Sequence, residues 1–286
     1  MADVITPFLV YLESERGRST HTISAYKVDL EQFIAIWEKS NIPLNPDSFS
    51  IKPVEQYLNW LQSQNYQPST IARKCAAVRG FLEYFKQDND LSLSYIDNYV
   101  RNLTPTRQRP QTLSKGKIRA LLDAPKKSST PLALRDAAIL PLMYETGIRA
   151  ADVLPLLVED FDSQGARIFI RTIRNSFYAL EEASVLIDRY LQEGRPHLAR
   201  IPEENHLFLN QRGKALTRQG IWFIVKHWAK EADLGDEISP NTIRHSLIQH
   251  LLDSGLSNRK ILRKLGLKSP NSLRAFHPSR RKLGDE

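Results

Sequence analysis

Two arginines in this sequence lie where a phosphate group can be bound. Arg149 is part of "ETGIRAADVLPL" and Arg244 is part of "SPNTIRHSLIQHLLDSG", each close to the expected start of a helix. A guanidinium at such a place adds two charge-assisted hydrogen bonds to the positive field of the helix N-terminus, which suits a phosphate. Either arginine can equally be a structural cap. Taken alone, these two stretches favour the structural interpretation.

Other common chemistries have no matching motif. The sequence contains no Walker loop, dinucleotide fingerprint, CxxC pair or HExxH motif. His245 and His250 are five residues apart, a spacing that puts them off a shared helical face, so we predict no metal site and no cofactor. The single cysteine, Cys75, excludes an internal disulfide and is typical of a small core residue, which fits a reducing, cytoplasmic setting. No run of about 18 apolar residues is present, so we expect no membrane span.

The charge of the chain is concentrated near its end. The net charge is +8 with a sequence pI near 9.5. Between Ser254 and Gly284 there are nine lysines and arginines and no acidic residue. A polyanion is therefore an expected partner, and nucleic acid is the default candidate.

The first hundred residues read as helices. Apolar residues recur at spacings of three and four in "RSTHTISAYKVDLEQFIAIW", "KPVEQYLNWLQS" and "STIARKCAAVRGFLEYF", and Ser69 is a plausible N-cap for the last of these. Arg73, Lys74 and Arg79 lie away from the apolar face of that helix. For these three residues a solvated surface is the simpler interpretation, and DNA contact is the functional alternative.

A polar, basic stretch interrupted by proline, "RNLTPTRQRPQTLSKGK", reads as an inter-domain linker. We therefore predict a helical domain over 1–103, a linker over 104–112 and a second domain over 113–286. In the second domain Ser114 caps a helix, and Gly147 ends the apolar helix "LALRDAAILPLMYETG". The alternation in "ARIFIRTIRNSFYAL" predicts a β-hairpin turning near Arg174 and Asn175, and further helices follow near 181–193, 217–232, 240–254 and 257–265.

The two arginine motifs and their neighbours resemble a known family. The N-terminal stretches, followed in order by "LSKGKIRALLDAP", "RDAAILPLMYETGIRAADVLPL", "LFLNQRGKALTRQGIW", "SPNTIRHSLIQHLLDSG" and "KLGLKSPNSLRAF", resemble the tyrosine recombinases of the phage-integrase and Xer class over nearly the whole chain. The resemblance implies a mainly α fold with a small antiparallel β-sheet. It would consist of a helical SAM-like core-binding domain and an α+β catalytic-type domain.

Members of this family attack a DNA phosphodiester with a tyrosine hydroxyl, and two arginines clamp the phosphate. The resemblance puts these arginines at Arg149 and Arg244, so both are present. The other catalytic positions depart from the pattern. Asn241 replaces a histidine or lysine, Leu267 replaces a histidine or tryptophan, and Phe276 replaces the tyrosine nucleophile. An amide cannot shuttle a proton near pH 7.

The lysine of the family's hairpin also has no equivalent, because no lysine occurs between Lys127 and Lys214. Arg171 or Arg174 stands near its place, but a guanidinium supplies charge and no proton. The resemblance and the charge pattern together predict the following DNA-phosphate contacts: Arg149, Arg244, Arg171, Arg174, His245, Lys268 and Arg274. The candidates in the N-terminal domain are Arg73, Lys74 and Arg79.

These departures predict a double-stranded DNA-binding homologue that does not cleave, with an accessory, regulatory or architectural role in recombination or integration. An active recombinase at the same site, or a second copy on DNA, is a possible partner. Only ten residues follow Phe276, so we do not expect the family's trans-docking helix. Two alternatives stay open. One is an active recombinase that uses a non-standard nucleophile, such as Ser272, His277 or Ser279, or one supplied in trans. The other is a protein-interaction module that no longer binds DNA.

Overall fold

The computed structural model describes residues 4–40, 42, 51–85, 90–103, 109–171, 176–267 and 269–276. The chain divides into two compact units, Met1–Arg107 and Gln108–Glu286, called unit 1 and unit 2 below. Residues 104–108 of the predicted linker lie outside the described part, so the limits of the linker and of the two domains stay a prediction.

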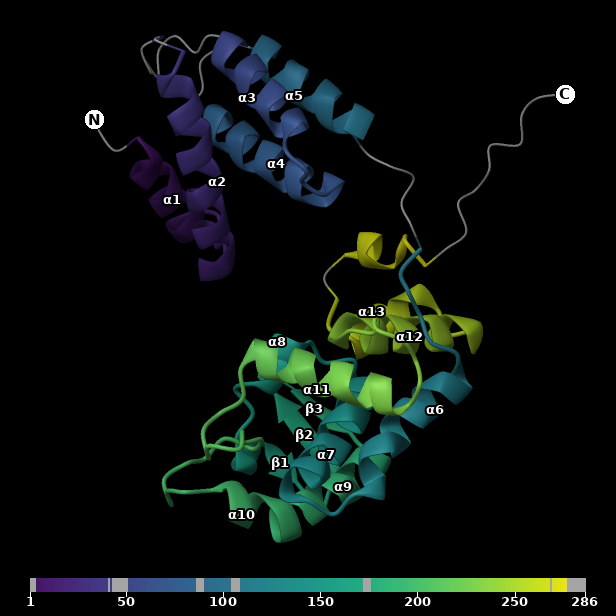
Figure 1. Ribbon diagram of the computed structural model, residues 1–286. Coiled ribbons are helices and arrows are strands. Elements are labelled where there is room, and N and C mark those ends of the chain that lie inside the picture. The colour runs from purple at the N-terminus through teal and green to yellow at the C-terminus, as the bar shows by residue number, and fades with distance from the viewer. Residues whose placement is uncertain are drawn as a thin grey trace, which may run out of the picture. The chain divides into compact units, whose positions relative to one another are not determined.

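Unit 1 is built from helices (Figure 1). Its described elements are α1 (Ile5–Ser14), α2 (Thr20–Glu38), α3 (Ile51–Ser63), α4 (Pro68–Tyr84) and α5 (Asp90–Leu103). Its core is rich in aromatic rings, and Phe33 makes edge-to-face contacts with Trp37, Tyr57 and Phe81 at centroid distances of 5.5, 5.2 and 6.5 Å. Such aromatic pairs stabilise the fold by more than the burial of their apolar area alone. The predicted apolar faces of α2, α3 and α4 are the ones that pack together.

The start of α4 differs from the prediction. The helix begins at Pro68, one residue before the expected cap Ser69, and the N-cap is Gln67, whose side chain makes no capping hydrogen bond. Proline fits the first turn because its missing N–H would have no partner there. The prediction that Ser114 caps the next domain's first helix is confirmed, since its hydroxyl accepts a hydrogen bond from the Lys117 N–H at 3.4 Å.

Unit 2 combines helices with one small sheet. Its longer helices are α6 (Lys115–Asp123), α7 (Pro131–Thr146), α9 (Glu182–Arg189), α11 (Arg218–Glu231), α12 (Pro240–Asp253) and α13 (Asn258–Lys264). Short helical turns are η1 (Ala124–Lys127), α8 (Ala150–Val153), η2 (Val158–Asp160), η3 (Tyr190–Gly194), α10 (Arg195–Leu198) and η4 (Pro270–Leu273). Figure 1 shows α12 and α13 together at one end of this unit and the sheet beside α7.

The sheet has three antiparallel strands in the order β1 (Phe161–Asp162), β2 (Arg167–Ile170) and β3 (Ser176–Ala179). Phe169 pairs with Phe177 across β2 and β3, while Ile168 and Ile170 point to the buried side. This alternation confirms the two strands of the predicted hairpin, although its turn at 172–175 lies outside the described residues. The mainly α fold with a small antiparallel sheet is therefore confirmed.

Helix α7 runs through the centre of unit 2. Twelve of its residues are buried, and it ends at Gly147, whose φ of 65° is left-handed, as the sequence predicted for a C-cap. Because α7 packs against other elements on most of its sides, its position in unit 2 is fixed. The turn that follows α7 therefore begins at a fixed place. Among the described helices none is long and apolar enough to cross a membrane.

Candidate nucleic-acid interface

The site is organised around Arg244, which lies in the second turn of α12. Ser239 caps this helix by accepting from the Thr242 N–H at 3.3 Å, and Pro240 occupies its first turn. The Arg244 side chain is only 7% exposed. Its guanidinium donates to the Gly147 carbonyl through Nη1 and to the Leu265 carbonyl through Nη2, the latter at 3.5 Å. Two backbone carbonyls thus orient Arg244 and leave its other N–H groups for a further acceptor.

Gly147 is required at the turn for two independent reasons. Its left-handed φ of 65° suits glycine, and a Cβ at this position would collide with Leu265 and approach Leu247 Cδ2 at 3.0 Å. The same residue presents the carbonyl that Arg244 uses. The end of α7, the interior of α12 and the residue after α13 therefore meet at one closely packed point.

Arg149 follows this turn and lies at the N-cap of α8 with extended backbone. Its side chain is 53% exposed, and its Nη1 lies 3.7 Å from Asp152 Oδ2. Burial first, and then the charge of Arg149, lower the pKa of Arg244 to about 10, while Asp152 and Tyr178 act in the opposite direction. The two predicted phosphate ligands are therefore close enough to repel each other, and an anion between them would relieve that repulsion.

Phe276 lies beside the arginine site. Its ring is 8% exposed and packs with a small apolar cluster from α12, α13 and η4, including Ile261, Leu265 and Leu273. Its centroid is 5.5 Å from the imidazole of His245 at an interplanar angle of 74°. Burial, and then the charge of Arg244, lower the pKa of His245. The aromatic side chain thus docks within its own chain, next to the residue that follows Arg244.

The other family positions are distributed around this centre. Asn241 is exposed in the first turn of α12, three residues before Arg244 and on the same side of the helix. Leu267 is half-buried against the cluster that holds Phe276, and Arg274 is exposed. Lys268 and Arg174, two predicted phosphate contacts, lie outside the described residues, as do His277 and Ser279.

No contact among the described residues brings Arg171 to Arg149 or Arg244. Its guanidinium forms ion pairs with Asp160 and with Glu159, the second at 3.3 Å, and lies over the ring of Phe169 at 5.8 Å. Asp160 also caps the preceding turn by accepting from the Leu157 N–H. A phosphate at Arg171 would have to compete with two carboxylates that already neutralise its charge.

The three N-terminal candidates on α4 are also paired with acids. Lys74 is 4% exposed and donates to Asp29 at 3.0 Å, so the prediction that it lies on a solvated face is wrong. Its alkyl chain and ammonium are covered instead by α2 and by the ring of Tyr66 at 5.0 Å. Arg73 is half-exposed and shares the Asp29 carboxylate. Arg79 pairs with Glu83 at 3.0 Å and with Asp97 at 3.1 Å.

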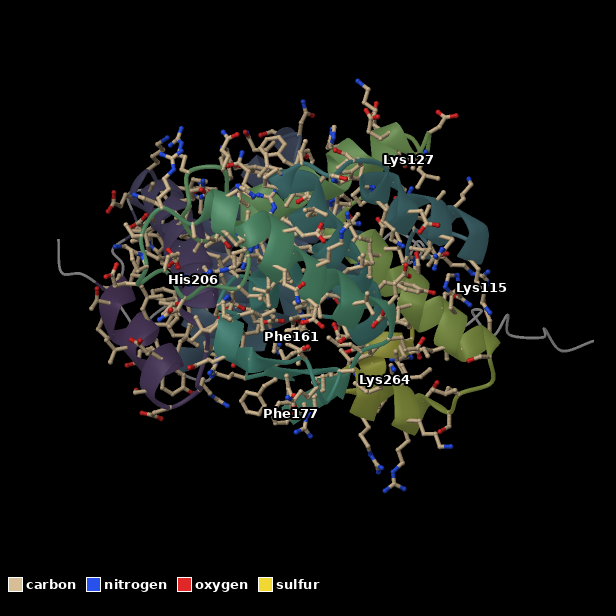
Figure 2. All side chains as sticks on the ribbon, turned by 90° about the horizontal axis from the view of Figure 1, so that it is seen from below. Lys115, Lys127, Phe161, Phe177, His206 and Lys264 are labelled. Atoms are coloured by element: carbon tan, nitrogen blue, oxygen red, sulfur yellow. The ribbon has the colours of Figure 1, made fainter. Side chains whose placement is uncertain are left out.

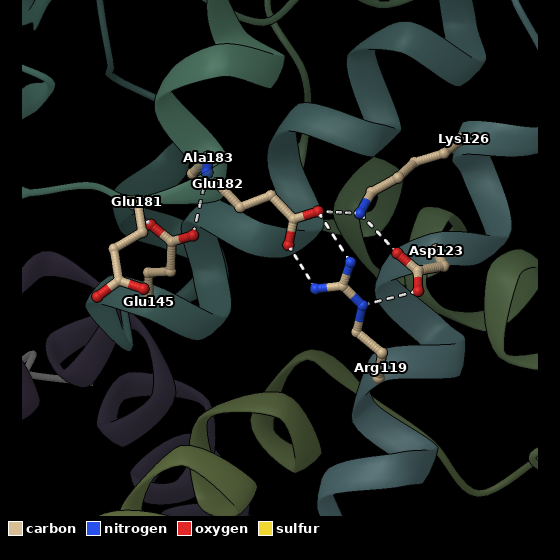
Figure 3. Close-up of polar contacts among 7 residues, drawn as sticks. All are labelled: Arg119, Asp123, Lys126, Glu145, Glu181, Glu182 and Ala183. Atoms are coloured by element: carbon tan, nitrogen blue, oxygen red, sulfur yellow. Dashed lines mark hydrogen bonds and ion pairs between the residues drawn. The ribbon is translucent and has the colours of Figure 1, made fainter.

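The sequence interpretation missed two acids near the site. Asp152 lies three residues after Arg149, a spacing that alone could have suggested a helical pair. Glu145 lies in the last turn of α7 and accepts hydrogen bonds from the N–H groups of Glu181 at 2.8 Å and Ala183 at 3.0 Å (Figure 3). Burial raises the pKa of Glu145 despite these bonds. No local pattern reveals this contact, because its partners are 36 and 38 residues away.

Figure 3 also shows how the start of α9 is held from its other side. Glu182 pairs with Arg119 and Lys126, and both cations also contact Asp123. Together with Glu145, this network fixes the segment that follows β3 against α6, η1 and α7. The turn with Gly147 and Arg149, which follows α7 directly, is therefore attached to a part of unit 2 that these contacts fix in place.

Comparison with known proteins supports the resemblance over most of the chain. The phage integrase family model matches residues 111–281, and the model of the phage integrase N-terminal SAM-like domain matches residues 5–89. Tyrosine recombinase XerD of Listeria innocua is 34% identical over 274 residues, which cover 93% of this chain and 90% of that protein. Tyrosine recombinase XerC of Herpetosiphon aurantiacus is also 34% identical over 274 residues, which cover 93% of this chain and 87% of that protein.

Solved structures share the fold at lower identity. XerH site-specific recombinase bound to its difH substrate has a TM-score of 0.68 and 20% identity, covering 96% of this chain and 82% of that one. The Tn1549 transposon integrase in complex with circular intermediate DNA has a TM-score of 0.72 and 15% identity, covering 96% and 95%. Two family models that match both parts of the chain, relatives at 34% identity and the shared fold lead to one conclusion: this chain belongs to the phage integrase family of tyrosine recombinases.

Proposed function

We propose that this protein binds double-stranded DNA as a member of the tyrosine recombinase family but does not cleave it. The observation that carries the proposal is Phe276, a buried phenyl ring at the position where the family has its tyrosine. A phenyl ring has no oxygen with which to attack phosphorus, so strand cleavage through this position is excluded by its chemistry.

The surroundings of Phe276 reinforce this proposal. Proton transfer to the reacting oxygens needs a group that gains and loses a proton near neutral pH. Asn241 and Leu267, at two further catalytic positions, cannot do this. His245 does titrate, but it lies under the Phe276 ring and its pKa is lowered. Neither a nucleophile nor its usual acid is present at the family positions.

The phosphate-binding half of the site is retained. Arg149 is half-exposed beside the buried, oriented Arg244, and their mutual repulsion favours an anion between them. The solved structures of XerH with its difH substrate and of the Tn1549 integrase with circular intermediate DNA support DNA as the ligand. A clamp of this kind fits an accessory, regulatory or architectural factor in DNA recombination, acting with an active recombinase or with a second copy on the same DNA.

A second candidate is an active recombinase with another nucleophile. The observation in its favour is that relatives at 34% identity are tyrosine recombinases by name. Ser272 is exposed in η4, near Phe276 in sequence, and Tyr178 is close enough to influence the pKa of Arg244. The Ser272 hydroxyl forms no hydrogen bond with a general base among the described residues, and Asn241 and Leu267 stand at two of the family's catalytic positions, so the non-cleaving role is the better-supported function.

The deciding experiment offers the full chain a duplex with a nick that traps a cleaved strand on the enzyme. We expect salt-dependent duplex binding by gel shift and no covalent adduct on a denaturing gel, both for the wild type and for Phe276→Tyr. An adduct with the wild type would sink the proposal, and peptide mapping of that adduct would then identify the nucleophile. Cleavage by Phe276→Tyr alone would show that the remaining site is catalytically competent.

A further inference from the structure

Helix α13 carries four cations that the arginine pair does not explain. Arg259, Lys260, Arg263 and Lys264 are all exposed, whereas Ile261 between them is fully buried. Figure 2 labels Lys264 on this segment of unit 2. Ile261 and the following Leu265 hold the helix against the cluster around Phe276, so the orientation of its charged side is fixed.

Helical geometry gathers the four cations on one side. With 100° between successive residues, Arg259 and Arg263 lie opposite Ile261, and Lys260 and Lys264 lie next to them. The charges therefore form two rows of two, with members about 6 Å apart along the axis. Each row is an i,i+4 pair of like charges, which destabilises an isolated helix by about 0.2–0.5 kcal/mol.

No carboxylate offsets this repulsion within the part of the chain that the structure describes. None of the four cations forms an ion pair there, although Arg119, Arg167 and Arg189 in the same unit each pair with an acid at 2.7–2.9 Å. The helix dipole explains the placement of only two of the four cations. Arg263 and Lys264 are favourable in the last turn, but Arg259 and Lys260 lie in the first turn, where cations are unfavourable.

The charged helix is joined directly to the arginine site. Leu265, the residue after α13, accepts the hydrogen bond from Arg244 Nη2 at 3.5 Å. Arg263 and Lys264 thus lie within one or two residues of an atom that touches Arg244. The position of α13 relative to Arg244 is therefore fixed by a direct contact.

We infer that α13 is a second contact with the DNA backbone, separate from the Arg149–Arg244 pair, and that it supplies salt-sensitive affinity. This inference rests on the proposed DNA-binding function. The four cations would contact phosphates without reading base sequence. Their displacement of counterions should therefore appear in the dependence of the association constant on salt concentration.

The test compares pairs of neutralised residues in the full chain. The variants are R259Q/K260Q, R263Q/K264Q and the combination of all four. R189Q/K230Q is the control, because it lowers the net charge equally outside α13. Glutamine keeps good helix propensity and removes like-charge repulsion. R259Q/K260Q should therefore keep or raise the melting temperature, so weaker binding by this variant cannot come from unfolding.

Duplex binding is measured by fluorescence anisotropy between 50 and 200 mM salt. Each lost phosphate contact lowers the slope of log K against log salt by about 0.9. If two to four contacts are lost, the variant with all four substitutions should lose roughly 1.8 to 3.6 units of slope, which makes its affinity fall roughly 10- to 150-fold less over this range than that of the wild type. The control should keep the slope of the wild type.

The outcomes separate the two proposals. If the wild type does not bind duplex DNA, the proposed function fails. If the wild type binds but all α13 variants keep its slope, the α13 inference alone is overturned, and an acidic protein becomes the better partner for this helix. If R189Q/K230Q lowers the slope as much as R259Q/K260Q, the effect is one of net charge, and the assignment to α13 is likewise overturned.

Discussion

The basic residues of α4 in unit 1 and those of the arginine site and α13 in unit 2 look alike in sequence but differ in their partners. On α4, Arg73 and Lys74 share Asp29, and Arg79 lies between Glu83 and Asp97. In unit 2, Arg244 is bound by two carbonyls, Arg149 has one carboxylate at 3.7 Å, and the α13 cations form no ion pair among the described residues. Basic residues are therefore most available to a polyanion where the fold brings no close carboxylate, or only a distant one, to them.

This difference predicts that the α4 charges stabilise unit 1. Asp29 is 1% exposed and Lys74 is 4% exposed, so Asp29→Ala leaves a buried ammonium without its counter-charge. We expect the free energy of unfolding of unit 1 to fall by about 3–5 kcal/mol, measured by urea denaturation of the full chain with circular dichroism. Asp97→Ala is the control, because its pair with Arg79 is largely exposed and should contribute less than about 1 kcal/mol. Equal losses in the two variants would contradict the comparison.

The same difference predicts opposite effects on DNA binding. Arg149→Ala removes a half-exposed cation of the proposed phosphate site, and duplex affinity should fall about tenfold or more with little change in melting temperature. Arg79→Ala removes an equal charge that two acids already neutralise, and it should change affinity less than about threefold. Fluorescence anisotropy at one salt concentration compares them. If both variants weaken binding equally, ion pairing does not decide which cations reach the DNA.

The smallest expected effect is the pH dependence of stability that His245 contributes. The folded-state pKa of His245 is lowered by burial and by Arg244, so the unfolded chain, with a pKa of about 6.5, binds this proton more readily. Stability should therefore fall as the pH drops through 6.5, and the loss stops growing below the folded-state pKa. His245→Gln should flatten this part of the pH profile of the melting temperature. A profile as steep as that of the wild type would exclude a contribution from His245.

Much of the fold follows from local sequence. Apolar periodicity predicted α2, α3 and α4, the alternation around residues 167–179 predicted two strands, and Gly147 was recognised as the end of α7. These features depend on neighbours within a few residues. The burial of Lys74 could not be found in this way, because Asp29 and Gln32 are 45 and 42 residues away.

The candidate site was predictable to a similar degree. Family resemblance identified Arg149, Arg244 and Phe276, but it did not indicate that Arg171 is bound by Asp160 and Glu159. It also gave no sign that the Gly147 carbonyl and Leu265 carbonyl orient Arg244. Such contacts arise from tertiary packing, where a side chain's partners are decided by elements that are distant in sequence.

The two hydrogen bonds from Arg244 to backbone carbonyls have a consequence for how this protein can change over evolutionary time. Because Arg244 joins the Gly147 turn to the end of α13, its loss would disturb the fold whether or not DNA is bound. Among the residues that the structure describes, Arg149 forms an ion pair with Asp152, three residues away, and none that joins two distant elements. In a lineage that stopped binding DNA, selection would continue to retain Arg244, whereas Arg149 would be free to be substituted. The informative marker of a working phosphate site in descendants of this chain is therefore the exposed arginine.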